Sequence, residues 1–430
     1  MKVLILNSYQ NKGGAARAAV RLAEALPHAG VEVQYRCLFP TVMNAAQKAL
    51  WLTRVLYDRV PALLVARRKV HFSSHAPRNR ALVQWINQSD ADLVHLHWLN
   101  GGGMSIEDFK GIEKPMVWTL HDMWAFTGGC HYDNGCERYR QGCGACPTLN
   151  SSRPRDLSSR MAQSKRQVYR ELSHLSVVGV SDWVASCAAA SSSMAGLHIQ
   201  SLPNPIDTER FSPLDKREAR RALGLSQSKK VVLFGAMAAV DDKRKGFHKL
   251  LGALRELNLS QHGVELAIFG SEAPANGPEL GYPARYFGHV GDAQLRALYS
   301  AADVMVVPSL QETFGQTVSE AMACGTPVVA FGATGLVDII DHQRNGYLAR
   351  AYDETSLAEG IEWVLRHPDP KGLGLAARKK VVDAFRSEVV AERYRDFYKG
   401  CLERYQGAPA ADKRRAAIPL SVKPAEKNFL

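Results

Sequence analysis

Two short apolar runs with a helical segment between them limit most strongly how this chain can fold. Val304–Val307 is followed by a proline, and Val328–Phe331 follows a Gly-Thr-Pro turn. Between them, Gln316–Ala323 consists of good helix formers with apolar residues at helical spacing. Short apolar runs of this kind are typical of buried strands in parallel sheets, which need a crossover connection. The stretch therefore predicts a strand–helix–strand unit of an α/β fold.

Two glutamates lie within this unit, Glu312 in the loop after the first strand and Glu320 in the helix. Open α/β sheets hold ligands at the carboxyl ends of their strands, and the first turn of a helix offers unpaired N–H groups to an anion. We therefore expect both carboxylates to accept hydrogen bonds from hydroxyl groups of one ligand. The anionic part of that ligand would contact the helix start, formed by Phe314, Gly315, Gln316 and Thr317. Either glutamate alone would more often be a solvated or dipole-stabilised helix residue.

The order of these residues adds information that neither glutamate carries alone. Phe-Gly follows Glu312, and Ala-x-Ala-x-Gly-x-Pro-Val-Val follows Glu320 after a spacing of seven residues between the glutamates. This pattern resembles the donor-binding motif of the retaining glycosyltransferases of family 4, the glycosyl transferases group 1. The resemblance covers most of the chain and is strongest over residues 287–348.

The resemblance implies an α/β fold of GT-B architecture, in which two Rossmann-like domains face a central cleft. It places a nucleotide sugar on the second domain and an acceptor on the first, and it implies a retaining hexosyltransferase. We expect Glu320 to hold the ribose of that donor. The sequence has no carboxylate cluster typical of a catalytic metal site, so we expect that no catalytic metal is required.

Prolines at 203 and 205 make Leu202–Asp207 an extended segment, and we place the domain boundary there. The expected parts are an N-terminal acceptor domain with a Cys-rich insert, a nucleotide-sugar domain, a helix that returns to the first domain, and a basic tail. Their ranges are 1–205 with the insert at 128–148, then 206–385, 386–406 and 407–430.

Two glycine-containing turns are candidates for binding the donor phosphates. Gly13-Gly14 lies between the first strand and the first helix, a generic layout for a phosphate at a helix N-terminus or for a plain tight turn. In the second domain, the resemblance implies an Arg and a Lys that hold the donor diphosphate. Lys245, beside Gly246, fits the lysine position. The arginine position holds an alanine, so Arg244 is a candidate substitute.

Histidines mark two further candidate positions. His121 follows the apolar run Met116–Leu120 at a strand end, where the family has a histidine near the transferred sugar and the acceptor. A lone histidine would more often be structural. His289 and Val290 belong to a segment that resembles the one whose backbone receives the nucleobase in the family. The resemblance thus implies His121, Glu312 and Lys245 as catalytic residues.

After His121, four of the eight cysteines lie within a stretch of 17 positions, namely Cys130, Cys136, Cys143 and Cys146. The Cys-x-x-Cys pair has the spacing of a zinc knuckle, and the other two thiols could complete a structural zinc site. Two disulfides or free thiols are the competing interpretations. Similar Cys-rich loops occur among exopolysaccharide and O-antigen biosynthesis transferases, which the chain resembles in this respect.

The segment from Ala45 to Val70 mixes large apolar residues with a basic face that includes Arg67, Arg68 and Lys69. This composition suits a helix lying on an anionic lipid surface, with Trp51 and Leu56 at the interface. The alternative is an ordinary surface helix that packs its apolar face on the domain and is interrupted at Pro61.

A net charge of +12 over 430 residues indicates anionic partners: nucleic acid, phosphate-bearing substrates or an anionic membrane. No RNA-binding pattern or helix-turn-helix signal stands out, so we expect no nucleic-acid partner. The apolar run Val3–Leu6 is too short for a signal-peptide core, and no run of about 18 apolar residues predicts a spanning helix. We therefore expect a cytoplasmic protein, with peripheral binding to the inner face of the plasma membrane as a further hypothesis.

Together these features predict a glycosyltransferase that moves a sugar from a UDP- or GDP-sugar to a glycan or polyprenyl-diphosphate-linked acceptor in bacterial surface polysaccharide synthesis. A nucleotide-sugar epimerase or a phosphorylase on the same architecture is the alternative. A basic RNA-binding protein is a third hypothesis from a different class.

Overall fold

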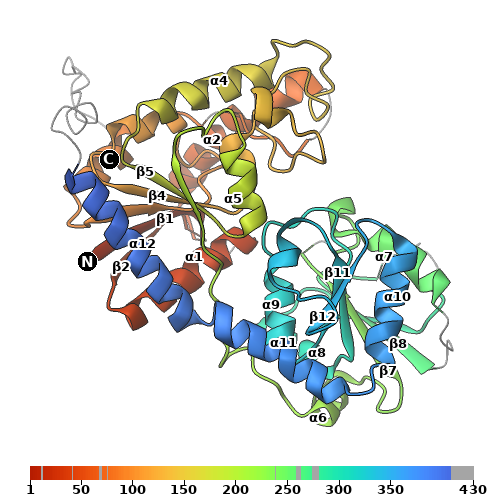
Figure 1. Ribbon diagram of the computed structural model, residues 1–430. Coiled ribbons are helices and arrows are strands. Elements are labelled where there is room, and N and C mark those ends of the chain that lie inside the picture. Colours follow the sequence, from red (N-terminus) through yellow and green to blue (C-terminus); the bar gives the residue numbers. More distant parts are fainter. Residues whose placement is uncertain are drawn as a thin grey trace, which may run out of the picture.

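The computed structural model describes residues 1–10, 13–40, 42–66, 70–74, 76–237, 239–257, 263–273 and 280–407. Two lobes, each built around a six-stranded parallel sheet with packed helices, make up the molecule (Figure 1). Arg67, Arg68, Lys69 and the tail from 408 to 430 lie outside the described residues.

The first sheet has the strand order β2-β1-β3-β4-β5-β6. Its strands are β1 (Lys2–Tyr9), β2 (Glu32–Phe39), β3 (Leu93–Leu96), β4 (Met116–Leu120), β5 (Leu175–Gly179) and β6 (His198–Ser201). The α-helices of this domain are α1 (Gly14–Ala25), α2 (Ala45–Ala66), α3 (Arg80–Gln88), α4 (Leu157–Arg170) and α5 (Asp182–Ala189). The central strands are buried on both faces, as expected for a parallel sheet covered by helices.

The second sheet has the order β12-β11-β10-β7-β8-β9. Its strands are β7 (Lys230–Gly235), β8 (Val264–Phe269), β9 (Ala284–Tyr286), β10 (Val304–Val307), β11 (Val328–Phe331) and β12 (Gly346–Ala349). Its helices are α6 (Lys216–Leu223), α7 (Phe247–Glu256), α8 (Asp292–Ala301), α9 (Gln316–Ala323), α10 (Glu354–Leu365) and α11 (Pro370–Phe385). The unit β10–α9–β11 has the predicted bounds, and β10 lies in the middle of the sheet between β11 and β7.

The chain passes between the lobes twice at one place. Ile206 in the segment after β6 donates its N–H to the carbonyl of Phe385 (2.8 Å), and Ser387 donates to the carbonyl of Ile206 (3.1 Å). Helix α12 (Ser387–Gly407) then returns to the first domain (Figure 1), where Tyr394 and Tyr398 are buried with residues of β1 and β3. The last helix therefore belongs to the core of the first lobe.

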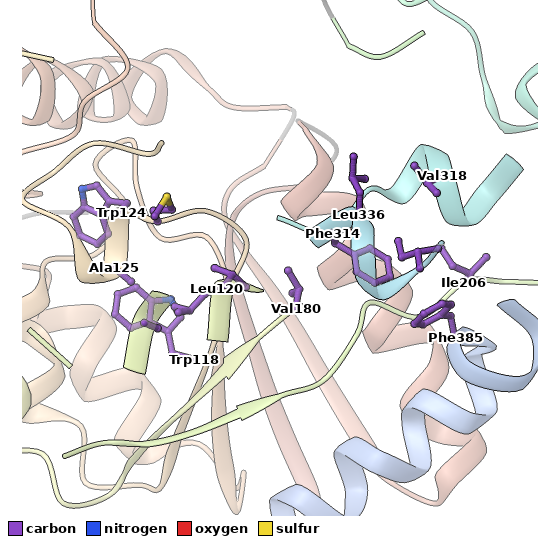
Figure 2. Packing of buried hydrophobic residues seen from close by; sticks show 14 of the residues in the cluster. Trp118, Leu120, Trp124, Ala125, Val180, Ile206, Phe314, Val318, Leu336 and Phe385 are labelled. Atoms are coloured by element: carbon purple, nitrogen blue, oxygen red, sulfur yellow. The ribbon is translucent and has the colours of Figure 1, made fainter. Parts of the chain in front are cut away.

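A continuous apolar cluster connects the two lobes. Phe314, Val318 and Leu336 of the second domain lie beside Ile206 and Phe385 (Figure 2), and the same cluster includes residues of β4 and β5 in the first domain. Burial of apolar surface across this boundary stabilises one arrangement of the domains.

Helix α2 is not interrupted at Pro61, unlike the surface helix that was the alternative interpretation of this segment. It continues through Pro61, although proline removes one N–H donor from the helix interior. Its buried residues are Asp58, Ala62 and Ala66, and most of its large apolar side chains are exposed. In the part of the chain that the structure describes, no helix is both long and apolar enough to cross a membrane.

Candidate active site

The loop after β10 and the loop after β7 bring Glu312 and Lys245 together. The Lys245 ammonium lies 2.7 Å from Glu312 Oε2, and both side chains are only 17% exposed. Burial alone would raise the pKa of Glu312, but the charges of Lys245 and Arg244 outweigh it, so the pKa is lowered. The carboxylate is therefore ionised and held beside a cation that could neutralise a phosphate.

Arg244 is occupied differently from Lys245. Its guanidinium pairs with Asp242 (2.7 Å) and donates to the carbonyl of Gln311 (3.2 Å). Its charged end also lies 3.9 Å from the ring centroid of Tyr132, in the Cys-rich insert of the first domain. As placed, Arg244 joins the insert to the loop that carries Glu312, and its role with a diphosphate stays a prediction.

Glu320 lies on the face of α9 that turns toward the first domain. Its Oε1 accepts from Arg21 of α1 (2.6 Å), and its Oε2 accepts from the hydroxyl of Tyr299 in α8 (2.8 Å). The residue is 1% exposed, so both carboxylate oxygens are occupied by protein groups. A ligand hydroxyl would have to share or displace these partners, and the expected ribose contact stays a prediction. Arg21 was not identified from the sequence.

The two glycines of the first turn lie opposite the start of α9. Gln316 donates its side-chain N–H to the carbonyl of Gly14 (2.8 Å). Gly13 has φ +90° and lies near the side chain of Met237, after β7. The structure thus brings the Gly13-Gly14 turn of the first domain to the helix start in the second.

The residues around that helix start divide into core and surface positions. Phe314 is 2% exposed, and its ring packs edge-on against Phe385, so its side chain belongs to the core. Gly315 has φ +100°, and a Cβ atom there would lie 2.7 Å from Leu336. Thr317 is partly exposed on the first turn. Phe314 and Gly315 can therefore contribute only their backbone groups to the expected anion contact.

His121 lies directly after β4 and contacts both another histidine and the second domain. Its Nε2 is 2.8 Å from Nδ1 of His97, which follows β3. Its carbonyl accepts from the hydroxyl of Thr313 in the Glu312 loop (2.9 Å). Burial lowers the pKa of His121 to about 4, so the ring is neutral at physiological pH. The contact with Thr313 places His121 next to the Glu312–Lys245 pair.

The predicted nucleobase segment lies at the edge of the second sheet. The carbonyl of Gly288 accepts from Gly270 after β8 (2.6 Å). His289 is exposed and Val290 partly exposed. Within the described ranges, no hydrogen bond or ion pair joins these two residues to the Glu312–Lys245 pair, and their role with a base stays a prediction.

The four clustered cysteines line one small cavity of about 20 Å³ together with Thr127, Asp133 and Ser158. All eight cysteines are free thiols, so the disulfide alternative is not seen. Within the described ranges, no three Cys, His, Asp or Glu side chains are arranged to hold a metal ion as they stand. The thiols therefore face a common space without converging on one point, and a zinc site would require them to turn inward.

A buried lysine lies beneath this cavity. Lys165 of α4 is 1% exposed and donates to the carbonyls of Trp124 and Thr127. Its charge interacts with the nearby thiols of Cys130 and Cys143, and no carboxylate lies within ion-pair distance among the described side chains. Burial lowers the pKa of Lys165 to about 7. Burial raises the pKa of the Cys143 thiol to about 11 and outweighs the charge of Lys165, which lowers that pKa.

The insert that carries these cysteines also contacts the second domain. Asp133 accepts from the side-chain amide of Gln311 (2.9 Å), next to Glu312. On the opposite side of the interface, Asp338 accepts from the first N–H of α5, at Asp182 (2.6 Å). Asp338 therefore satisfies an unpaired donor at a helix N-terminus of the other domain.

Comparison with known proteins bears on this arrangement. Residues 12–210 match the family model described as Glycosyltransferase Family 4, and residues 215–380 match the one described as Glycosyl transferases group 1. The chain is 25% identical to the phosphatidyl-myo-inositol mannosyltransferase of Mycobacterium leprae, over 91% of this chain and 94% of that protein. It is 28% identical to WcaC of Escherichia coli K12, named for colanic acid biosynthesis, over 55% of this chain and 58% of WcaC.

Most other curated relatives in this comparison match over about half of their length, and the first five are covered over 40% to 58%. Among solved structures, HepE of Anabaena in complex with UDP and glucose gives a TM-score of 0.61 at 18% identity, over 93% of this chain and 100% of HepE. The predicted GT-B fold is thereby confirmed. Two consecutive family models, the Glu312–Glu320 motif and the fold agree: the chain belongs to the family 4 glycosyltransferases of group 1.

Proposed function

We propose that this protein transfers a sugar, with retention, from a nucleotide sugar to a glycan acceptor, which we take to be lipid-linked, in the synthesis of a bacterial surface polysaccharide. One observation carries the proposal: the Glu312–Lys245 pair, the start of α9, the Gly13-Gly14 turn and His121 meet at one boundary between the domains. These groups come from four strand ends of two parallel sheets, where α/β proteins bind ligands.

The chemistry of these groups suits a sugar diphosphate. The leaving diphosphate gains negative charge as its bond to the anomeric carbon breaks. Lys245 and the N-terminus of α9 supply fixed positive charge near that point, so no divalent cation is needed for the step. Glu312 can accept hydrogen bonds from sugar hydroxyls while Lys245 keeps it ionised. Retention follows if the acceptor hydroxyl attacks from the face that the diphosphate leaves.

The relatives support the substrate class. HepE was crystallised with UDP-glucose, and WcaC is named for colanic acid biosynthesis. The Mycobacterium leprae relative is named as a mannosyltransferase that acts on a phosphatidylinositol, which is a lipid. From these relatives we infer that the donor of this chain is a UDP- or GDP-sugar and that its acceptor is a polyprenyl-diphosphate-linked glycan.

Helix α2 supports a lipid-linked acceptor. Its exposed apolar side chains are Leu50, Leu52, Leu56, Tyr57, Val60, Leu63, Leu64 and Val65, and Lys48 and Arg59 are exposed beside them. An apolar helix surface with basic neighbours suits the anionic inner face of the plasma membrane.

Two residues of α2, Trp51 and Arg54, contact the rest of the first domain. Trp51 is only partly exposed and packs near Tyr9 and Phe39, with ring centroids 6.5 and 6.3 Å apart. Arg54 donates to carbonyls of Pro77, Gly102 and Gly103. Trp51 is therefore partly covered by the domain, while Leu56 is 56% exposed, and the lipid contact of both residues stays a prediction.

A panel of nucleotide sugars tests the proposal. Purified protein should release UDP or GDP slowly from one donor, and faster when a polyprenyl-diphosphate glycan is added. The variant Lys245→Met should lose this release, whereas Lys371→Met, on an exposed turn of α11, should retain it. Absence of release from every UDP- and GDP-sugar, with and without acceptor, would contradict the proposed function.

A further inference from the structure

His97 and His121 form a hydrogen-bonded pair at the carboxyl ends of neighbouring strands. Nδ1 of His97 lies 2.8 Å from Nε2 of His121. The two imidazole planes are inclined by 18°, with centroids 5.1 Å apart. Nearly coplanar rings at this separation fit an in-plane N–H···N bond. One of the two nitrogens must therefore carry the shared proton.

Both rings are neutral, so each has one N–H. His97 is 1% exposed, and its ring also contacts that of His95, with centroids 4.3 Å apart and the planes tilted by 36°. Burial holds the pKa of His97 well below its usual value. A neutral imidazole has one donor and one acceptor, and the direction of one hydrogen bond fixes the tautomer of both rings.

The other nitrogen of His97 decides the direction. Its Nε2 is buried and has no hydrogen-bond partner among the side chains and backbone that the structure describes. If His121 were the donor, His97 would carry its proton on Nε2 and leave a buried N–H without an acceptor. If His97 is the donor, Nε2 is only an unused lone pair. Buried N–H groups without an acceptor are the rarer of the two in proteins.

We propose that His97 is a positioning residue that donates its Nδ1–H to His121 and thereby holds His121 as the Nδ1–H tautomer. The Nε2 lone pair of His121 then accepts the hydrogen bond from His97. Its Nδ1–H makes no hydrogen bond within the described part of the chain, and the side chain is partly exposed at the domain boundary. His121 is therefore a hydrogen-bond donor to the ligand and not a base.

The surroundings of the pair hold both rings in place. His95 is fixed from two sides, by the hydroxyl of Tyr398 at Nδ1 and that of Thr119 at Nε2, both at 2.7 Å. Its ring therefore gives His97 a fixed neighbour to pack against. The carbonyl of His121 is held by Thr313 of the second domain. The acceptor of the free N–H, a sugar hydroxyl oxygen, rests on the proposed function.

Nitrogen-15 NMR of protein labelled at histidine tests this assignment without any substrate. It separates protonated from bare ring nitrogens, and His121→Phe and His97→Leu identify the two spin systems. We expect a protonated Nδ1 and a bare Nε2 for both His121 and His97. A protonated Nε2 on His121 in the wild-type protein would overturn the proposal. Since no donor is added, the result does not depend on whether the protein is a transferase.

A matched pair of variants tests whether His97 sets the tautomer of His121. In His97→Leu the constraint is lost, and His121 should shift to the Nε2–H tautomer that free histidine favours. The His174 ring bonds the carbonyl of Ile112 (3.0 Å) near the opposite end of the sheet, so His174→Gln should leave the His121 signals unchanged. A folded His97→Leu protein that keeps His121 wholly as the Nδ1–H tautomer would show that His97 does not set it.

Discussion

Arg21 of the first domain and Glu320 of the second form an ion pair of 2.6 Å with side chains only 6% and 2% exposed. Tyr299 bonds the second carboxylate oxygen, and the Arg21 side chain also lies 5.2 Å from the ring centroid of Phe211. Glu320, which we expect to hold the donor ribose, is thus also a contact that joins the two domains. A ligand on Glu320 and the closure of the domains would then be coupled, because both use one carboxylate.

This pair predicts a stability effect. Glu320→Ala leaves a buried guanidinium without its partner, which typically costs about 3–5 kcal/mol. The variant should therefore unfold at clearly lower denaturant concentration than the wild type, measured by circular dichroism. The double variant Arg21→Met/Glu320→Leu, which removes both charges, should recover much of the loss. Equal unfolding midpoints for wild type and Glu320→Ala would show that the pair contributes no stability.

Donor binding needs a milder change at the same position. Glu320→Gln keeps the shape and one acceptor but removes the charge, so donor affinity should fall by about 1.5–3 kcal/mol, as for a hydrogen bond to a charged group. Calorimetric titration with the active nucleotide sugar measures this. Glu359→Gln, at an exposed position of α10, is the control and should bind normally. Undiminished affinity of folded Glu320→Gln would remove the ribose assignment.

The Glu312–Lys245 pair predicts a pH dependence of stability. The pKa of Glu312 is lower in the folded state than in the unfolded state, where it is about 4.3. The stability that the ionised carboxylate contributes is therefore complete above the unfolded-state pKa. It is lost as pH falls through the folded-state pKa. Lys245→Met should therefore destabilise the protein at about pH 7, by roughly 1 kcal/mol for a partly exposed pair. The difference from wild type should shrink toward about pH 3. A difference that stays constant with pH would mean that charge pairing is not its cause.

The sequence predicted the centre of the fold better than its edges. β4, β10 and β11 have the predicted bounds because each is a fully buried run that is apolar throughout, except for Thr119 in β4. The edge strands β6 and β9 were not predicted, because both are largely exposed and β9 has only three residues. Helices α3, α6, α7 and α11 were also missed. α3 and α6 are clearly amphipathic but only nine and eight residues long, so each gives little more than two turns of periodic pattern. In α11, Gly372 and Gly374 near the start weaken the helical signal.

For the site, the sequence identified the residues but not their partners. Glu312 and Lys245 were each assigned to the donor, yet their 2.7 Å pairing joins positions 67 residues apart. Arg21 is separated from Glu320 by 299 residues, and nothing in the first helix distinguishes it from its neighbour Arg17. Such contacts arise only when the two lobes meet. The His-x-His spacing at the end of β3 was a visible signal for His97, because alternate strand residues share one face.

The cysteine cavity predicts a structural zinc ion. If the four thiols turn into the cavity, a tetrahedral zinc–thiolate site carries net negative charge, which Lys165 beneath it would offset. Purified protein should then contain about one equivalent of zinc by mass spectrometry of the metal, and chelation should lower its thermal stability. Cys143→Ser should lose the metal, whereas Cys37→Ser, on β2 outside the cavity, should keep it. Metal-free protein of full thermal stability would rule the site out.

Exposed leucines on α2 predict binding to anionic membranes. Leu56 and Leu64 are 56% and 74% exposed, and each could bury its side chain in the lipid interface, worth about 1.5–3 kcal/mol for a fully buried leucine. The double variant Leu56→Ser/Leu64→Ser should therefore sediment with anionic liposomes much less than the wild type. Leu375→Ser, at a 69% exposed position of α11 in the second domain, is the control for general loss of surface apolarity. Neutralising Arg67, Arg68 and Lys69 should also weaken binding, by up to about 1 kcal/mol per charge, and more strongly at low salt. Equal binding of wild type and double variant, or equal binding to neutral and anionic liposomes, would show that α2 does not hold the protein on an anionic surface.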